Sequence, residues 1–521
     1  MFENQPKGLY ALAIANTGER FGYYTMLAVF ALFLRENFNL PPGTAGAIYS
    51  TFLALVYFLP LVGGALADKF GYGRMVTIGI IIMFFGYLLL SIPLGNQVIG
   101  YVGMFAALIF VSFGTGLFKG NLQVMVGNLY DAPELQSRRD SAFSIFYMAI
   151  NVGALFAPTA AVGIMKWAQE TYGITHAASY HFAFAVACAS LVFSIAVYYC
   201  FRYTFRHVEG NKTKAAAAAE RAGAVKDADK VDAKQAEAEK EDTHARVVAL
   251  CLVFAVVLFF WMAFHQNGLT LTFFANEFTE KQCHGIWRMA FDVVNLVLLI
   301  FIIYALFSLF QSKTTRARVI SALVIIVAAV GLVYKYHQLG AEPVEVSAPI
   351  FQQFNPCFVV ALTPVSIALF GWLAKHGKEP SAPRKIAWGM LVAAVAYFIM
   401  AIGSVGLLTP NAQEAAEAAG VATERVGSYW LISTYLVLTF GELLLSPMGI
   451  SFVSKVAPAN LKGTMMGGWF VATAVGNLLV GVGGYLWGDI SLPIVWGVFI
   501  AVCLIAAIFM ISIMKRVEKV C

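Results

Sequence analysis

Charged residues are scarce in this 521-residue sequence. Aspartate, glutamate, lysine and arginine together make up 12% of it, whereas 60% of the residues are hydrophobic. Soluble domains carry roughly 25% charged residues, so this balance excludes the ordinary soluble classes. Nucleic acid is not expected as a partner either. The chain is instead expected to have a lipid bilayer as its surroundings.

Paired cysteines and catalytic signatures are also missing. The seven cysteines form no C-x-x-C pair and stand mostly within apolar runs, so we interpret them as buried small side chains. The sequence contains no H-E-x-x-H, no G-x-S-x-G with a placed histidine and no Walker-type phosphate loop. We therefore expect no enzyme and no cofactor or metal, with an ion gradient instead of ATP as the energy source.

Long apolar runs are what the sequence has in abundance. Runs of about 20 residues, the length that a helix needs to cross a bilayer, recur along nearly the whole chain. They predict an all-α polytopic membrane protein with 14 transmembrane helices. No cleavable signal peptide precedes the first one, which is expected to stay as an anchor. The predicted segments are 8–34, 44–67, 75–94, 98–128, 141–165, 181–203, 245–276, 288–310, 317–335, 347–374, 385–408, 427–454, 463–487 and 492–514.

The distribution of lysine and arginine predicts the orientation of these helices. If Met1 lies in the cytoplasm, the alternating loops place 27 of the 35 basic residues on the cytoplasmic side, six outside and two within helices. Such an excess is the bias that sets membrane orientation. We therefore expect both termini to be cytoplasmic, and the membrane to be the plasma membrane, specifically a bacterial inner membrane.

One interval differs in kind from the rest. Residues 204–244 are rich in Ala, Lys, Glu and Asp and have almost no large apolar side chain, so they cannot bury a core. We interpret them as a charged cytoplasmic linker, and a contact of its basic residues with anionic lipid is the alternative. The linker separates an N-terminal six-helix bundle (1–203) from a C-terminal six-helix bundle (245–521) with two inserted helices at about 288–335.

A loop motif supports this division. "GALADKFGYGR" (Gly64 to Arg74) follows the second helix, and "GWLAKHGKEPSAPRK" (Gly371 to Lys385) occupies the matching loop of the second half. Six plus six helices is the architecture of the major facilitator superfamily, whose loop motif is similar to Gly64, Asp68 and Arg74. We interpret it as a gating element, in which the glycines let two helices meet and Asp68 accepts from a helix terminus. The alternative is a positively charged membrane anchor.

The first predicted helix carries charges at its midpoint, in "NTGERFGYY". An ionised side chain at bilayer depth costs roughly 2.5–3.5 kcal/mol, so such residues usually face a bundle interior or a watery cavity. At 100° per residue, Asn16, Glu19, Arg20, Tyr23 and Tyr24 fall within about 140° of arc. The pattern predicts a functional face, and an ion pair that only fixes helix packing is the alternative.

Two further charges lie deep in predicted helices. Lys119 stands in "GTGLFKGNLQV" and Glu442 in "LTFGELLLSPMG". With Arg20 and Lys119 on one wall and Glu442 on the other, the predicted cavity is bipolar. Its complementary ligand is a zwitterion with a separated carboxylate and ammonium, such as a short peptide.

Several motifs resemble those of one transporter family. "NTGERFGYY" is similar to the E-x-x-E-R-F-x-Y-Y motif of the proton-dependent oligopeptide transporter family of the major facilitator superfamily. "FSIFYMAINVGALFAP" resembles its F-Y-x-x-I-N-x-G signature, and "FQQFNP" and "GELLLSPMG" resemble its second-half motifs. The resemblance covers most of the chain outside 204–244 and 288–335. It implies a symporter that imports di- and tripeptides together with protons by alternating access, and that is functional as a monomer.

The resemblance also implies roles for individual residues. The two bases receive the peptide carboxylate, Glu442 and two amides receive the amino end, and tyrosines contact the peptide backbone and side-chain pockets, one of which Trp469 walls. From the residues alone, Asn151 and Asn355 could equally be interhelical hydrogen bonds. The implied substrate-binding residues are Arg20, Tyr23, Tyr24, Tyr57, Lys119, Asn151, Asn355, Glu442, Ser446 and Trp469.

The proton route is where this sequence departs from the family. The first acid of E-x-x-E-R is Asn16, the acid before the glutamine of the seventh helix is His265, and Ser50 stands where animal relatives have a histidine. His265 is either a titratable substitute for the acid or a neutral side chain bonded across helices. The implied proton-coupling residues are Glu19, Arg20, Lys119, His265 and Glu442.

The alternatives for the whole protein are two. One is a transporter of the same fold for another small zwitterionic or anionic solute, because members of a superfamily share motifs while differing in cargo. The other is a membrane receptor or a purely structural membrane protein.

Overall fold

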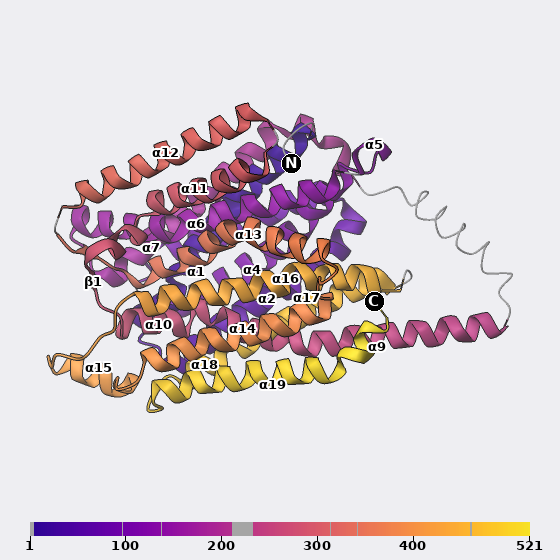
Figure 1. The fold of residues 1–521 in the computed structure, drawn as a ribbon. Coiled ribbons are helices and arrows are strands. Elements are labelled where there is room, and N and C mark those ends of the chain that lie inside the picture. Colours follow the sequence, from indigo (N-terminus) through magenta and orange to yellow (C-terminus); the bar gives the residue numbers. More distant parts are fainter. Residues whose placement is uncertain are drawn as a thin grey trace.

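The computed structural model describes residues 5–95, 97–136, 138–210, 233–312, 314–340, 342–458 and 461–520. Its long helices run side by side along a common direction (Figure 1). The first part of the chain forms α1 (Lys7–Phe38), α2 (Pro42–Phe70), α3 (Tyr72–Ser91), α4 (Gln97–Asn128), the short α5 (Pro133–Gln136), α6 (Arg139–Tyr172) and α7 (His176–Cys200). Two 3-10 turns follow, η1 (Arg202–Thr204) and η2 (Arg206–Val208).

The second part of the chain continues the pattern. It begins with α9 (Ala233–Phe264), η3 (His265–Gly268), α10 (Thr270–Glu277), η4 (Gly285–Phe291), α11 (Val293–Gln311), α12 (Thr315–Gln338) and η5 (Ala348–Gln353). It ends with α13 (Phe354–Lys375), α14 (Ala382–Gly403), α15 (Pro410–Ala418), α16 (Tyr429–Val456), α17 (Lys462–Leu479), α18 (Gly481–Leu486) and α19 (Leu492–Glu518). A two-residue antiparallel ribbon pairs β1 (Gln282–Cys283) with β2 (Val344–Glu345).

Thirteen helical stretches in the described ranges are long and apolar enough to cross a membrane. The fourteenth predicted span is α1, which is 32 residues long but carries the charged midsection noted above, and this lowers its hydropathy. The predicted all-α polytopic architecture is confirmed, and this is an integral membrane protein.

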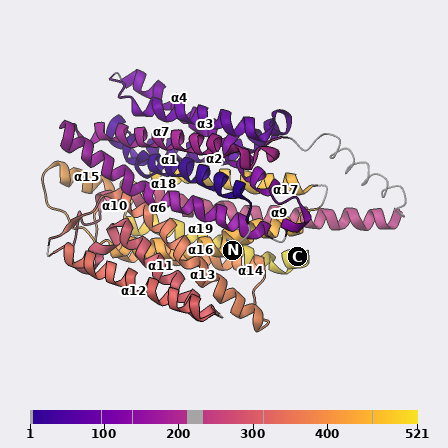
Figure 2. The same cartoon turned by 90° about the horizontal axis from the view of Figure 1, so that it is seen from above.

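The helices form two groups that meet along a few elements. Within the N-terminal bundle (α1 to α7), α1 packs on α6 and α7, and α3 packs on α4; within the C-terminal bundle (α9 to α19), α14 packs on α16 and α19. The bundles touch where α2 packs along α17 and α18, and where α6 packs on η5 and α13. The view from above shows this arrangement (Figure 2).

Only the two ends of the predicted linker are among the described residues. The chain leaving α7 folds back through η1 and η2, and the Glu209 carboxylate accepts hydrogen bonds from Arg202 and, at 2.9 Å, from the Tyr198 hydroxyl. The Gly73 amide at the start of α3 donates to the Glu209 carbonyl at 3.1 Å. Residues 211–232 of the predicted linker lie outside the described residues, and α9 begins within it at Ala233.

The two chain ends lie at the same end of the molecule. The start of α1 and the end of α19 are found there, while α15 and β1 lie at the opposite end (Figure 1). A chain that crosses the membrane an even number of times has both of its ends on the same side. The end with α15 and β1 is therefore the predicted extracellular end.

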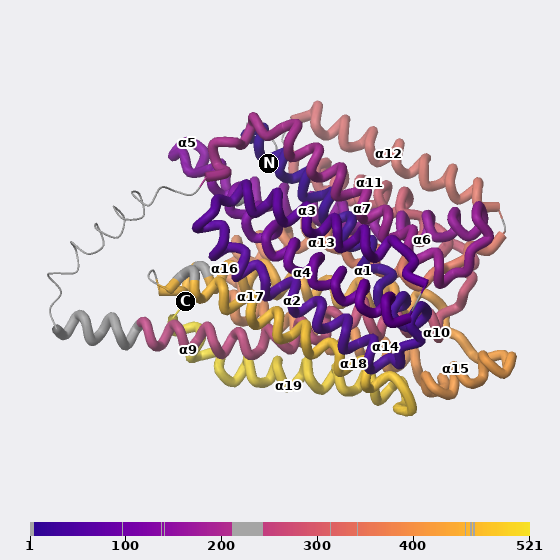
Figure 3. Tube along the Cα trace, turned by 180° about the vertical axis from the view of Figure 1, so that it is seen from behind, coloured from indigo at the N-terminus to yellow at the C-terminus, as the bar shows by residue number. Residues whose placement is uncertain are grey.

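The two inserted helices lie at the periphery, as Figure 3 shows for α11 and α12. Only 11% of the most apolar stretch of α12 is buried. At the predicted extracellular end an ion pair between Lys335 and Asp292 joins the two helices. The other carboxylate oxygen of Asp292 caps α11 by accepting from the Val294 amide at 2.8 Å. Nearer the end where α11 leads into α12, the Ser321 hydroxyl donates to Ser308 at 2.8 Å.

Close packing of α2 on α4 depends on glycine. A Cβ atom added to Gly63 would lie 2.1 Å from the Gly116 carbonyl oxygen, so only glycine fits there. The loop-motif glycine Gly64 does not take part in this contact, because a Cβ atom on Gly64 would meet nothing within 4 Å. Asp68 accepts from the Tyr72 hydroxyl at 3.0 Å, across the helix break at Gly71, while the Arg74 side chain is exposed.

The seventh crossing is not one continuous helix. The predicted segment 245–276 is interrupted by the 3-10 turn η3 between α9 and α10. At this turn a Cβ atom on Gly268 would lie 1.9 Å from the Tyr49 hydroxyl of α2, so the two bundles approach each other closely here.

Candidate functional site

The charged face of α1 forms a buried ion pair. Arg20 donates from Nε to Glu19 Oε2 at 2.5 Å and from Nη2 to Glu19 Oε1 at 2.6 Å. Glu19 is fully buried and Arg20 is 3% exposed. The guanidinium carbon also lies 4.6 Å from the centre of the Tyr23 ring. Because the pair sits inside the bundle, water does not weaken it, and its two-point geometry orients the arginine.

The second predicted base approaches from α4. Lys119 Nζ lies 4.0 Å from the centre of the Tyr57 ring on α2, a cation–π contact. The close packing of α2 on α4 at Gly63 brings these two side chains together. Lys119 also interacts electrostatically with Arg20 and Glu19. The structure thus gathers the predicted carboxylate-binding residues in one place.

The predicted acid lies in the C-terminal bundle. Glu442 on α16 is 8% exposed, and its Oε2 accepts from Asn355 Nδ2 of α13 at 2.9 Å. The same amide donates to Thr439 Oγ1 at 3.0 Å. One of the two alternatives for Asn355 is therefore realised, an interhelical bond, and that bond leads directly to the acid.

Two tyrosines interact with both the acid and one of the bases. Tyr24 and Tyr57 each interact electrostatically with both Arg20 and Glu442. A further one, Tyr147 on α6, interacts with Glu442, Tyr24 and Tyr57. Sequence reasoning missed Tyr147, although it stands in the quoted "FSIFYMAIN" motif. The arrangement thus has Lys119 and the Arg20–Glu19 pair in the N-terminal bundle and Glu442 in the C-terminal bundle, with tyrosines that interact with both.

Three other predicted residues are less directly placed. Asn151 donates to the Tyr147 carbonyl of its own helix at 3.0 Å, and no bond joins it to the acid. Trp469 is 3% exposed and packs over Gly449, where a Cβ atom would lie 1.9 Å from the indole ring. Ser446 is half-buried on α16, one turn after Glu442.

The three residues that depart from the family motif have different surroundings. His265 Nδ1 lies 2.6 Å from Asn477 Oδ1 of α17, which is the cross-helix bond of one predicted alternative. The His265 ring centre is also 6.0 Å from that of Tyr57, which places it beside the Lys119 contact. Asn16 Nδ2 is buried, with no hydrogen-bond partner among the described residues, and Ser50 donates to Ala47 of its own helix.

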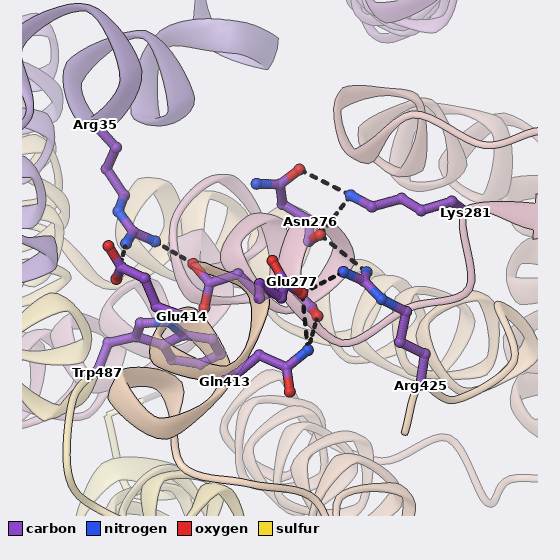
Figure 4. A network of polar contacts seen from close by, with 9 residues as sticks. Arg35, Asn276, Glu277, Lys281, Gln413, Glu414, Arg425 and Trp487 are labelled. Carbon is purple, nitrogen blue, oxygen red and sulfur yellow. Dashed lines mark hydrogen bonds and ion pairs between the residues drawn. The ribbon is translucent and has the colours of Figure 1, made fainter. Parts of the chain in front are cut away.

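A second polar cluster lies at the predicted extracellular end, and sequence reasoning missed it (Figure 4). Arg35, near the end of α1, forms an ion pair with Glu277 at the end of α10, and Glu277 also accepts from Trp487 Nε1 at 2.8 Å. Arg35 lies 3.3 Å from Glu414 of α15 as well. The Arg35–Glu277 pair joins the two bundles at their outer ends, with both side chains less than one-fifth exposed.

The C-terminal part of this cluster holds Glu277 in position. Gln413 donates to the Glu277 carbonyl at 3.0 Å and to Glu417 at 2.9 Å. Arg425 bonds Glu417 at 2.5 Å and the Thr279 carbonyl at 3.0 Å. In the described part of the chain, no group of three or more His, Cys, Asp or Glu side chains could hold a metal ion.

A family model and curated relatives match this chain. The model of the POT family matches residues 73–222 and 337–488, more than half of the sequence. YclF, an uncharacterised transporter of Bacillus subtilis (strain 168), is 29% identical over 507 residues, covering 92% of this chain and 87% of the relative. Dipeptide and tripeptide permease A of Escherichia coli (strain K12) is 26% identical over 508 residues, covering 94% and 85%. A di-/tripeptide transporter of Lactococcus lactis subsp. lactis (strain IL1403) is 26% identical over 501 residues, covering 92% and 89%.

Solved structures match the fold along the whole chain. A peptide transporter POT in complex with sulfate has a TM-score of 0.71 at 23% identity, covering 100% of this chain and 96% of that one. A POT family transporter in complex with 5-aminolevulinic acid has a TM-score of 0.70 at 20% identity, covering 100% and 98%. These matches confirm the predicted major facilitator superfamily fold.

Proposed function

We propose that this chain, which belongs to the POT family, is a proton-coupled symporter that imports di- and tripeptides by alternating access. We place it in a bacterial inner membrane with both termini in the cytoplasm, acting as a monomer. The curated relatives named as di- and tripeptide transporters, which match over more than nine-tenths of this chain, support the peptide substrate.

The observation that carries the proposal is the bipolar arrangement of buried charges. Arg20 and Lys119 lie on the side of the N-terminal bundle, and Glu442 with Asn355 lies on the side of the C-terminal bundle, while Tyr24 and Tyr57 interact with both sides. A peptide carboxylate fits the bases and its ammonium fits the acid. Buried charges are costly unless they are paired, and a zwitterion pairs both sides at once.

Uptake into proteoliposomes tests this function. An inwardly directed proton gradient should drive the accumulation of a labelled dipeptide above its external concentration, and a protonophore should abolish it. Unlabelled di- and tripeptides should compete, while single amino acids and organic anions should not. Competition by a single amino acid instead of peptides would favour the other same-fold transporter.

The amino-end site supplies the first residue-specific prediction. We expect Glu442→Gln to weaken the binding of free dipeptides about 10- to 100-fold, because a bond to a charged group contributes roughly 1.5–3 kcal/mol. Binding of N-acetylated dipeptides, which lack the ammonium, should change less than about threefold. Competition binding on purified protein measures both, with the exposed Glu424→Gln as a matched control. Equal losses for the two ligands would remove Glu442 from the amino-end site.

The outer ion pair is proposed to be an extracellular gate. Alternating access requires that contacts at one end of the molecule break while those at the other form. Arg35 and Glu277 join the two bundles at the extracellular end, so the described structure is closed there. Glu414, 3.3 Å from Arg35, belongs to the same bundle as Glu277, so Arg35 must leave both for the gate to open.

Removing one partner of this gate should shift the conformational equilibrium. We expect Arg35→Gln and Glu277→Gln to raise the ratio of outward-open to closed protein about tenfold or more. Spin labels on Glu170→Cys and Glu424→Cys, two exposed positions, would report longer distances in a background without native cysteines. Glu414→Gln should change little, since Glu414 is 70% exposed. Unchanged distances in both gate variants would show that the pair does not hold the gate.

A further inference from the structure

Two adjacent glutamines of the "FQQFNP" motif divide their hydrogen bonds between the two bundles. Gln352 Nε2 donates to the Ala28 carbonyl of α1 at 3.2 Å and to Thr272 Oγ1 of α10 at 3.1 Å. Gln353 Oε1 accepts from Thr159 Oγ1 of α6 at 2.8 Å, and its Nε2 donates to the Ala290 carbonyl at 3.4 Å. Each side chain thus has one partner in the N-terminal bundle and one in the C-terminal bundle.

These glutamines end η5, which leads without a break into α13. Gln353 is the residue that precedes the first helical residue of α13, and Asn355 follows two positions later. Asn355 in turn holds Glu442 at 2.9 Å and Thr439 at 3.0 Å. A shift of η5 relative to α6 therefore moves the amide that orients the acid.

We propose that Gln352 and Gln353 are positioning residues that hold Asn355 and Glu442 in place for the amino end of the substrate. They do so only while the extracellular side is closed, because their bonds to Ala28 and Thr159 cross between the bundles. This inference rests on the proposed function and adds that the amino-end site is complete in only one of the alternating states.

The partners in the C-terminal bundle explain how the site changes. When the bundles separate at the outer end, Gln352 keeps Thr272 and Gln353 keeps the Ala290 carbonyl, so each glutamine loses a single bond. Gln353 is fully buried in the closed structure, and its carbonyl oxygen then loses its hydroxyl donor. Without this bond η5 is no longer tied to α6, so Asn355 no longer holds a fixed place beside Glu442.

The test separates the amino-end site from general stability. Thr159→Val keeps the shape of the side chain but removes the hydroxyl, and Thr159→Ser keeps the hydroxyl and is the matched control. We expect Thr159→Val to weaken the binding of free dipeptides roughly tenfold, from the loss of one hydrogen bond to a buried group. Binding of N-acetylated dipeptides should change less than twofold, and Thr159→Ser should bind both like the unmodified protein.

A second variant guards against a folding defect in the first. Gln352→Met keeps the length of the side chain but cannot donate to Ala28, and it should show the same selective loss. Equal losses for free and acetylated peptides, or no loss in either variant, would overturn the inference. The unmodified protein is assayed in parallel, since its failure to accumulate dipeptide would instead contradict the proposed function.

Discussion

Glu19→Gln is expected to abolish the proton-driven accumulation of dipeptide while leaving counterflow exchange between equal concentrations largely intact. Glutamine keeps the size of the side chain but cannot bind a proton. A proton can drive transport only through a group whose proton affinity differs between the two states of the carrier. Glu19 is suited to this, because its carboxylate occupies two donors of Arg20 at 2.5 and 2.6 Å. Protonation would release Arg20 toward the substrate carboxylate and so couple the two ligands.

Parallel assays in proteoliposomes decide this prediction. Accumulation is measured with an imposed pH gradient, and counterflow is measured with preloaded unlabelled dipeptide and no gradient. Glu170→Gln, at an exposed position of α6, is the matched control and should behave like the unmodified protein. His265→Asn should only shift the pH optimum modestly. If Glu19→Gln still concentrates dipeptide and His265→Asn does not, the histidine carries the coupling.

Arg20→Lys is expected to lower dipeptide uptake at least tenfold although the charge is kept. The guanidinium holds Glu19 with two nitrogen atoms and still has N–H groups left for a carboxylate. An ammonium is a point charge that cannot reproduce this planar two-point geometry. Losing one charge-assisted bond, at roughly 1.5–3 kcal/mol, corresponds to about 10- to 100-fold in affinity.

Binding and uptake should be measured together for this variant. Arg316→Lys, at an exposed position near the start of α12, is the matched control for replacing an arginine by a lysine. We expect the loss in Arg20→Lys to appear for acetylated and free dipeptides alike, because both keep the carboxylate. Unchanged affinity and uptake would remove Arg20 from the substrate site.

The sequence predicts a feature best when all the residues that reveal it lie in one helix. The charged face of α1 could be predicted because Glu19 and Arg20 stand in an apolar run, where an unpaired charge is costly. The peripheral helices α11 and α12 could be predicted from the length of their apolar runs alone. Glu442 was predicted from its place deep in an apolar run, and Asn355 through motif resemblance. Their contact at 2.9 Å agrees with a shared role, although their binding of substrate stays a prediction.

Other features depend on residues that are distant in sequence. Arg35 and Glu277 lie at helix ends, where charges are common, so nothing in either segment marks them as partners. The break at η3 went unnoticed because the interrupted segment stays apolar on both sides, and Gly268 reveals its role only against Tyr49 of the other bundle. The motif names Gly64 but not Gly63, and the close approach to α4 is made by Gly63.

Because η3 interrupts the helix, α10 is a short separate segment that can tilt about this turn. Its eight residues span about 12 Å at 1.5 Å per residue, and Glu277 stands at the far end while His265 stands at the pivot. A tilt of about 10° there displaces Glu277 by about 2 Å, enough to separate it from Arg35, whereas His265 hardly moves. In the proposed gate, a small angular change beside Tyr57 would therefore separate an ion pair at the predicted extracellular end.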